Sequence, residues 1–205
     1  MNYDMWGGVH VRRAVTADDL ENVYAIRWHG YKKYFSEPDQ VREALDTAPN
    51  ARLLLATDRN GIAIGTMRIL DRRLGAIELD QYLNVDSLLP VERHPAADGS
   101  RLSVPASEQS MFVKTALWKA YFHFCRDHGI RSMIASVRPA AARDYQRLMF
   151  EHLGPRGTYT YTRLGNKPHE TWVLDVATAK LRYRDAGHPF YEFFHEWEHP
   201  NIRYD

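Results

Sequence analysis

Residues 100–137 have the sequence SRLSVPASEQSMFVKTALWKAYFHFCRDHGIRSMIASV, and this stretch decides the fold. Its first residues alternate in polarity as a half-buried strand does, with Leu102 and Val104 on one face. Apolar side chains then lie almost all round a predicted helix from Gln109 to His128. A helix with so narrow a polar face is buried on most of its sides.

Gly129 follows that helix where a C-cap glycine is expected, and residues 131–137 form a second strand. Two strands of one sheet that are joined by a crossover helix run parallel. The other expected elements are strands at 10–15, 52–57, 62–70, 157–163 and 170–176, helices after Thr16 and at 39–46 and 140–153, an irregular cover at 78–90 and a polar loop at 92–100. This order predicts an α/β fold, a mixed sheet with one central parallel pair flanked by helices.

The chain has 205 residues and a formal net charge of +1. Its length suits one domain, and its charge gives no reason to expect nucleic acid as a partner. We expect the domain to span residues 1–176. Residues 177–205 are expected to form an aromatic-rich C-terminal extension packed on the same domain.

One cysteine, Cys125, lies on the predicted buried helix, so no disulfide is expected and a reducing compartment is suitable. No apolar run approaches membrane-spanning length, and residues 1–15 lack the apolar core of a signal peptide. We therefore expect a cytoplasmic protein with no integral membrane contact. His195 and His199 are four residues apart, but no third ligand is evident, so we expect no metal site.

Three arginines interrupt apolar patterns: Arg27 on the first helix, Arg68 on a hairpin strand and Arg101 on the strand at the start of the central unit. A buried guanidinium group is costly unless a carboxylate pairs with it. Asp46, just before the hairpin, and Asp98, three residues before Arg101, are the expected partners. Such a cluster is either a structural ion-pair network, which the periodicity alone favours, or the charged floor of a substrate pocket.

Short blocks of the sequence also resemble known motifs. Residues 45–56 (LDTAPNARLLLA) place an Asp before a strand, and residues 65–70 (GTMRIL) place a Gly and an Arg on the next strand. Arg27 with Tyr31 is similar to an Arg-x-x-x-Phe motif, and residues 100–104 are similar to a Ser-Arg-Leu strand. This set resembles the acyl-homoserine-lactone synthases and, more closely, the related N-acyl amino acid synthases. Both have the fold of GCN5-related N-acyltransferases (GNAT).

The resemblance implies a GNAT-like sheet in which the central parallel strands splay apart. It implies an N-acyltransferase that moves a long-chain fatty acyl group from an acyl carrier protein to the amine of an amino acid or similar small acceptor. The acyl-phosphopantetheine arm is then the donor substrate, held between the two strands, and no cofactor is bound permanently. The implied catalytic residues are Asp98, Arg101 and Tyr145, and the implied substrate-binding residues are Arg27, Tyr31, Asp46, Arg68, Leu102, Ser103, Val104, Ser136 and Val137.

Two departures from the motifs bear on the activity. The acyl-homoserine-lactone synthase motif has a glutamate where this chain has Asp98, and residues 105–110 (PASEQS) lack the glycines of the acetyltransferase phosphate loop. Without glycine the backbone approaches a pyrophosphate at a helix N-terminus less easily, which favours a carrier protein over coenzyme A as donor. The alternatives are a coenzyme A-dependent N-acetyltransferase and a non-catalytic module that binds acyl chains or the carrier.

Some residues keep two interpretations. Asp98 is either the general base or the partner of Arg101, and Tyr145 is either the general acid, by analogy with this fold, or a packing residue. The C-terminal extension is a lid over an acyl chain, a contact in a homodimer or a completion of the core, and its aromatic residues are Phe190, Tyr191, Phe193, Phe194 and Trp197.

Overall fold

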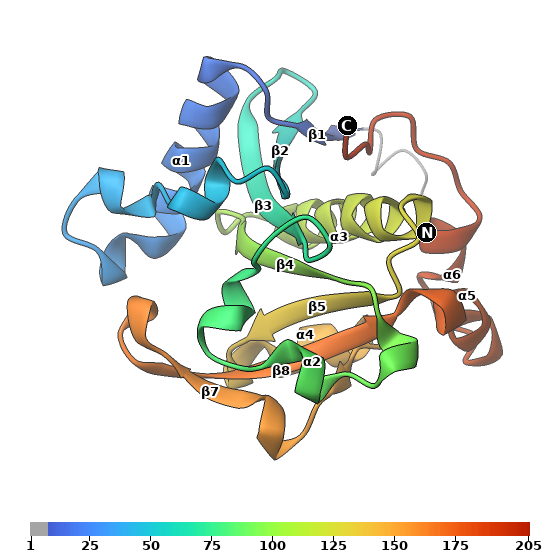
Figure 1. Ribbon diagram of the computed structural model, residues 1–205. Coiled ribbons are helices and arrows are strands. Elements are labelled where there is room, and N and C mark those ends of the chain that lie inside the picture. The colour runs from blue at the N-terminus through green and yellow to red at the C-terminus, as the bar shows by residue number, and fades with distance from the viewer. Residues whose placement is uncertain (1–7) are drawn as a thin grey trace. The chain divides into compact units, whose positions relative to one another are not determined.

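The computed structural model describes residues 8–205, and the contacts divide the chain into two compact units. The first unit contains the described residues up to 69 together with 101–124 and 199–205, and the second contains 70–100 and 125–198. Two strands and a helix contribute residues to both units, namely β3 (Ala63–Asp71), β4 (Ala96–Ser103) and α3 (Ser110–Asp127). Figure 1 shows the path of the chain by colour.

The first unit contains an antiparallel strand pair and a hairpin. β1 (Val9–Arg13) runs antiparallel to β2 (Ala51–Asp58), and β2 neighbours β3. At the hairpin, the Asp58 carboxylate accepts two backbone N–H groups of the turn at 2.9 Å. Gly61 has a φ of 81°, a conformation that glycine adopts without a steric cost. The predicted hairpin is confirmed.

Helix α1 (Ala17–Tyr31) lies beside β2 in the first unit (Figure 1). It begins at a capping box in which the Thr16 hydroxyl accepts the N–H of Asp19 and the Asp19 carboxylate accepts the N–H of Thr16. Arg12 donates to both oxygens of this carboxylate at 2.6 Å. The predicted capping box, with Asp in place of Glu, is therefore confirmed.

We expect Asp19→Asn to lower the free energy of unfolding by about 1 kcal/mol at neutral pH. The hydrogen bonds from Arg12 hold the pKa of Asp19 well below its usual range, and backbone N–H groups contribute. A lowered carboxyl pKa stabilises the fold above the unfolded-state value of about 3.9, and this stabilisation is lost as the pH falls toward the folded-state value. The difference between wild type and variant should therefore shrink in acid. Urea unfolding at several pH values checks this, and a difference independent of pH would contradict it.

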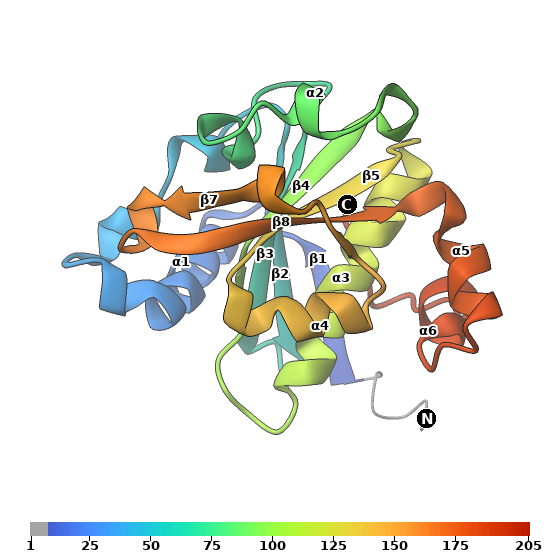
Figure 2. The same ribbon diagram turned by 90° about the horizontal axis from the view of Figure 1, so that it is seen from below.

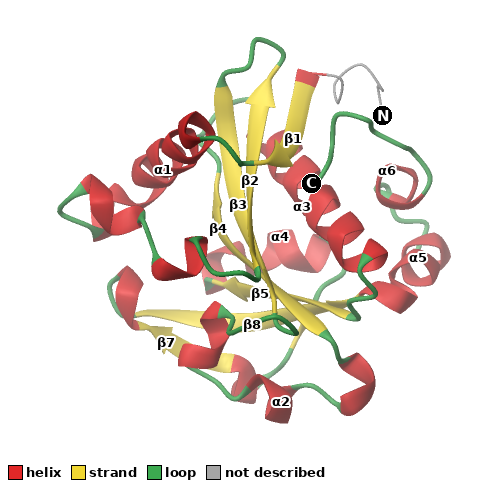
Figure 3. Cartoon of the chain, turned by 45° about the horizontal axis from the view of Figure 1, so that its top comes forward, coloured by secondary structure: helices red, strands yellow, loops and turns green. Residues whose placement is uncertain are grey.

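The second unit contains a mixed sheet. β4 runs parallel to β5, with Ala96 opposite Ser132 and Gly99 opposite Ala135, where the pairing ends. β8 pairs antiparallel with β5, β6 and β7, and Figure 3 shows β7 and β8 side by side. The predicted parallel pair and α/β class are confirmed. The strands other than β4 are β5 (Ser132–Val137), β6 (Glu151–His152), β7 (Thr158–Tyr161) and β8 (Lys167–Asp175).

Short helical elements lie between and after the strands of both units, and α5 and α6 lie side by side in Figure 2. In the first unit they are η2 (Lys32–Tyr34), η3 (Pro38–Val41) and η4 (Ala44–Asp46). In the second unit they are η5 (Glu78–Gln81), α2 (Val85–Leu88), η6 (Val91–Arg93), η7 (Pro139–Ala141), α4 (Ala142–Arg147), η8 (Pro155–Gly157), η9 (Thr162–Leu164), α5 (Val176–Asp185) and α6 (Tyr191–His195).

Three sequence predictions were wrong in extent. The loop expected at 92–100 is strand from Ala96 onward. Its small and polar residues do not indicate a strand, but parallel pairing with β5 supplies the backbone hydrogen bonds that form one. The helix expected at 39–46 is two separate turns, η3 and η4, with Arg42 extended between them. The helix expected at 140–153 ends at Arg147, since Met149 has a φ of 59° and residues 151–152 pair with β8.

The predicted burial of helix α3 is confirmed, and Cys125 is fully buried on it. Its polar stripe does not face water throughout, because Lys119 is also fully buried and its Nζ lies 2.7 Å from Nδ1 of His199. In the C-terminal extension, Phe193 and Phe194 are buried within the second unit, which supports completion of the core among the three predicted roles. None of the described helices is long and apolar enough to cross a membrane.

Candidate active site

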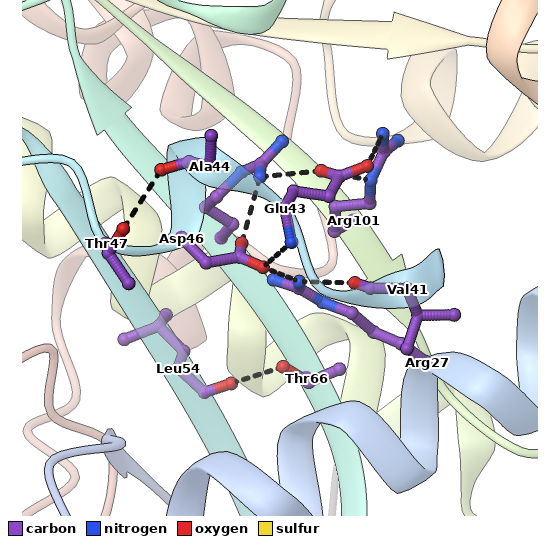
Figure 4. A network of polar contacts seen from close by, with 10 residues as sticks. Arg27, Val41, Glu43, Ala44, Asp46, Thr47, Leu54, Thr66 and Arg101 are labelled. Atoms are coloured by element: carbon purple, nitrogen blue, oxygen red, sulfur yellow. Dashed lines mark hydrogen bonds and ion pairs between the residues drawn. The ribbon is translucent and has the colours of Figure 1, made fainter. Parts of the chain in front are cut away.

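Three arginines surround two carboxylates in the first unit (Figure 4). Asp46 pairs with Arg27 of α1 at 2.7 Å and with Arg68 of β3 at 2.9 Å. Glu43 pairs with Arg68 at 2.8 Å and accepts two hydrogen bonds from Arg101 of β4, the one from Nε at 2.9 Å. The predicted residues Arg27, Asp46, Arg68 and Arg101 therefore belong to one network.

This network is buried. Arg27 and Arg68 are each 0% exposed, and the Asp46 carboxylate also accepts the backbone N–H of Glu43 at 3.0 Å. Burial lowers the pKa of Arg27, and the Asp46 charge opposes that change. The ordinary pKa of a guanidinium group is so high that Arg27 stays charged at neutral pH. Because a buried charge is costly without a partner, each of these carboxylates contributes strongly to the fold.

Sequence reasoning missed Glu43. It lies in the segment expected to be a continuous helix, where an exposed glutamate needs no explanation. The signal available was its spacing of three residues from Asp46, just before a hairpin that carries an arginine. The turn η4 places both carboxylates beside that arginine, Arg68.

Helix α1 is also bonded to the end of β4 within the first unit. The Tyr31 hydroxyl donates to the carbonyl of Leu102 at 3.1 Å, and the Ser103 hydroxyl donates to the carbonyl of Ile26 at 3.0 Å. Arg101 lies 6.0 Å from the ring centroid of Tyr31 and has a φ of 53°, which is uncommon for a residue with a side chain. These contacts fix the backbone of the predicted substrate strand.

We expect Gly30→Ala to lower the free energy of unfolding by about 1–3 kcal/mol through overpacking. A Cβ at Gly30 would lie 2.4 Å from Oγ of Ser103, and this hydroxyl is held by its hydrogen bond to Ile26. Gly129→Ala is the comparison for backbone strain alone. Its φ of 65° is unfavourable for alanine, but no atom lies within 4 Å of the added Cβ, so any loss of stability there is not caused by crowding. Thermal unfolding with and without Ser103→Ala checks the cause: relief of the Gly30→Ala loss by the second change is expected, and no relief would contradict it.

The second unit holds Asp98, Ser136, Val137 and Tyr145. Asp98 is 0% exposed and lies opposite Ile134 of β5. Residues two apart on a strand share a face, so Ser136 lies on the face of Asp98, and Val137 lies on the other. The ring of Tyr145 packs edge-to-face on Phe150 at 5.6 Å, and its role as general acid stays a prediction.

The strand register extends this face to β7. Ser136 lies opposite Thr171 of β8, and His169, two residues earlier, lies opposite Tyr159 of β7. The side chains of Asp98, Ser136, Thr171, His169 and Tyr159 therefore share one face of the sheet. This alignment of residues from four strands was not predicted from the sequence.

The segment that follows β3 in the second unit supplies more side chains to this face. Glu78 of η5 is buried, and its charge acts on the Tyr159 phenol. The ring of Tyr82 stacks on Tyr159 at 4.9 Å and lies 5.0 Å from Tyr161. The predicted irregular cover at 78–90 therefore contacts β7. Tyr82 and Tyr159 were missed as site candidates, because an aromatic residue in an aromatic-rich chain is no specific signal.

The eight other predicted residues, Arg27, Tyr31, Asp46, Arg68, Arg101, Leu102, Ser103 and Val104, lie in the first unit. Chemically, the first unit offers a buried cationic network beside the backbone of residues 101–104. The second unit offers carboxylates, hydroxyl groups and aromatic rings on one face. Carboxylates suit proton removal from an amine, and backbone N–H groups suit a developing oxyanion.

Comparison with known proteins assigns the fold. The structure of FeeM, an N-acyl amino acid synthase from uncultured soil microbes, is similar with a TM-score of 0.70 and 15% identity, over 90% of this chain and 96% of that one. The CoA-dependent acyl-homoserine lactone synthase BjaI is similar with a TM-score of 0.60 and 19% identity, over 89% and 91%. An acyl-CoA N-acyltransferase from Pseudomonas aeruginosa gives 0.57 and 15%, over 80% and 97%. The predicted GNAT-like fold is confirmed.

The sequence itself gives the family. No sequence among the curated proteins matches the chain. The profile of the family described as N-acyl amino acid synthase FeeM matches residues 22–173, which is most of the chain and includes both the arginine network and Asp98. The predicted resemblance is thereby confirmed: the chain belongs to the FeeM family of N-acyl amino acid synthases and is an N-acyltransferase.

Proposed function

We propose that this N-acyltransferase moves a fatty acyl group from the phosphopantetheine thioester of an acyl carrier protein to the amine of an amino acid or similar small acceptor. The observation that carries the proposal is the family match over residues 22–173, since the family is described by the acylation of amino acids. The similar fold of FeeM over 90% of the chain supports it.

The choice of a carrier protein as donor is supported by the segment before α3. This helix begins at Ser110, and residues 105–109 between β4 and the helix contain no glycine. A glycine-free loop leaves less room for a pyrophosphate to approach backbone N–H groups at a helix N-terminus. The phosphopantetheine arm of a carrier has one phosphate only, so it needs fewer backbone N–H groups of this loop than a pyrophosphate does.

In the proposed reaction the amine nitrogen attacks the thioester carbonyl carbon. A C–N bond forms, the C–S bond breaks, and the pantetheine thiol leaves. An ammonium acceptor loses two protons, of which Asp98 takes the first as general base and the leaving thiolate takes the second, through Tyr145 as general acid. Backbone N–H groups near Ser103 and Val104 would stabilise the oxyanion, and Arg101 would hold the strand that bears them.

Mass spectrometry of a complete reaction tests the proposal. The wild-type protein is incubated with a long-chain acyl carrier protein and a mixture of amino acids, and Arg101→Ala and Asp98→Asn proteins serve as controls. A new acyl-amide in the wild-type reaction only is the expected result, and its mass identifies the acceptor. Absence of any acyl-amide with every carrier tested, from a folded wild-type protein, would overturn it.

Coenzyme A as donor is the second candidate, because the similar structure BjaI is described as CoA-dependent. The same amino acid mixture with a long-chain acyl-coenzyme A in place of the carrier separates the two donors. We expect kcat/KM to be at least tenfold higher with the acyl carrier protein than with acyl-coenzyme A. A higher kcat/KM with acyl-coenzyme A would identify coenzyme A as the donor.

A further inference from the structure

Two hydroxyl groups on the Asp98 face of the second unit are buried without a hydrogen bond of normal geometry. Neither Oη of Tyr159 nor Oγ of Ser136 has a hydrogen-bond partner at normal distance and angle among residues 8–205. A buried hydroxyl group that makes no hydrogen bond is costly, and such groups in native proteins call for an explanation such as a ligand. Here two of them come from different strands, β7 and β5, and share one face of the sheet.

Two carboxylates of the second unit, Asp98 and Glu78, act on the Tyr159 hydroxyl. Burial raises the pKa of Tyr159, a weak hydrogen-bond interaction with the Ser136 hydroxyl opposes this rise, and the charges of Asp98 and Glu78 add to it. The strand register puts Ser136 and Asp98 on the same face of the sheet as Tyr159, and Glu78 belongs to η5, whose C-cap residue Tyr82 stacks on Tyr159. Tyr159 keeps its proton at neutral pH, so its oxygen is a neutral group that both donates and accepts. The surroundings of the phenol are therefore rich in oxygen atoms and negative in charge.

Aromatic rings belong to the same face of the sheet. Tyr82 stacks on Tyr159 at 4.9 Å, and the ring of His169 lies 4.9 Å from that of Tyr161. The faces of tyrosine rings attract cations, and the attraction grows where water is excluded. Because Tyr82 is only partly buried, this layer of rings reaches the surface of its unit. Oxygen acceptors, carboxylate charge and aromatic faces together match one ligand chemistry, that of an ammonium cation.

We propose that Asp98, Glu78, Ser136 and Tyr159, covered by Tyr82, form a binding site for the acceptor amine in its ammonium form, and that the Tyr159 hydroxyl is a specificity-determining contact. The inference rests on the proposed function, for which it names the charge state of the acceptor that binds. The three N–H groups of a primary ammonium are directed at carboxylate and hydroxyl oxygens. An alcohol of the same shape offers one donor and no charge, so the site discriminates against it.

Tyr159→Phe tests the contact, because it removes one oxygen and keeps the stacked ring. The KM for the amine acceptor should rise about tenfold, the size expected for a lost hydrogen bond to a charged group. The KM for the acyl carrier protein should stay unchanged. The melting temperature should not fall, because the lost hydroxyl makes no hydrogen bond of normal geometry among the described residues.

Tyr183→Phe is the matched control. Tyr183 is a buried tyrosine of the second unit, and its hydroxyl, unlike that of Tyr159, donates to the carbonyl of Leu148 at 2.6 Å. Its loss leaves that carbonyl without this donor, so the melting temperature should fall while the KM for the acceptor is unchanged. An unchanged acceptor KM in Tyr159→Phe, or equal rises in both variants, would overturn the assignment.

A binding experiment without any donor separates this inference from the proposed function. Calorimetry with hexylamine, which is an ammonium at neutral pH, is compared with calorimetry with hexan-1-ol of the same shape. Hexylamine should bind wild type at least tenfold more tightly than hexan-1-ol does, and Tyr159→Phe should reduce that preference. If this holds while no acyl-amide forms, the ammonium site stands and the proposed reaction falls. Equal binding of the two ligands overturns the site.

Discussion

Asp98→Asn is expected to lower the kcat for acyl-amide formation by 10²–10⁴-fold, roughly the contribution of a general base. Asparagine keeps the shape of the side chain but has no basic oxygen to take a proton from the amine. Asp98 is 0% exposed on β4, which shields such a proton transfer from bulk water. Steady-state rates with saturating donor and acceptor measure the effect, and circular dichroism checks that the variant is folded.

Asp80→Asn is the control for this change. Asp80 follows Glu78 on η5 in the same unit, but it pairs with Arg72 at 3.2 Å near the surface. We expect its kcat to stay within about twofold of wild type, since it takes no part in the proposed proton transfer. If Asp98→Asn keeps its kcat and loses stability instead, Asp98 is a structural ion-pair partner, and the base must be sought elsewhere.

Asp46→Asn is expected to lower the free energy of unfolding by about 3–5 kcal/mol, the range for breaking a buried ion pair from one side. Both oxygens of Asp46 are in use, one with Arg27 at 2.7 Å and the other with Arg68 at 2.9 Å. The neutral amide leaves two guanidinium groups inside the protein with one carboxylate, Glu43, beside Arg68. Urea unfolding followed by fluorescence measures the loss.

Asp86→Asn provides the comparison with a surface ion pair. Asp86 binds Arg72 through both oxygens, at 2.6 and 3.0 Å, so its geometry matches a strong pair, but its side chain is 64% exposed. Water and salt screen such a pair, so only a small fraction of the Asp46→Asn loss is expected. Equal losses in the two variants would show that the arginine network contributes no more than a surface contact.

The arginine network also bears on the proposed site. It joins α1, η4, β3 and β4 through Arg27, Asp46, Arg68, Glu43 and Arg101. Arg101 is held by Glu43 in a left-handed backbone conformation immediately before residues 102–104. The ion pairs show the structural network, and a role of these residues beneath a substrate pocket stays a prediction.

Local patterns in the sequence were sufficient for several elements and for the family. The all-round apolar helix at 110–127, the hairpin turn at Asp58 and the capping box of Thr16 and Asp19 depend on residues close together in the chain. So do the motifs around Arg68 and Arg101, which were enough to identify the N-acyl amino acid synthases. Short-range hydrogen bonds and periodic burial depend on residues that are neighbours in the chain, so the sequence alone predicts them.

Only the tertiary structure decided which distant side chains meet. Arg101 and Glu43 are 58 residues apart, and nothing in the local sequence of either shows that they pair. Strand β4 begins at Ala96 because β5 supplies its hydrogen bonds, and Tyr159 shares a face of the sheet with Ser136 because β8 aligns their strands. Such contacts depend on the packing of segments that are remote in the chain. The sequence by itself therefore determined the locally encoded elements, the family and the class of reaction, and the packing of the strands determined the bounds of the other elements and the partners that make up the candidate site.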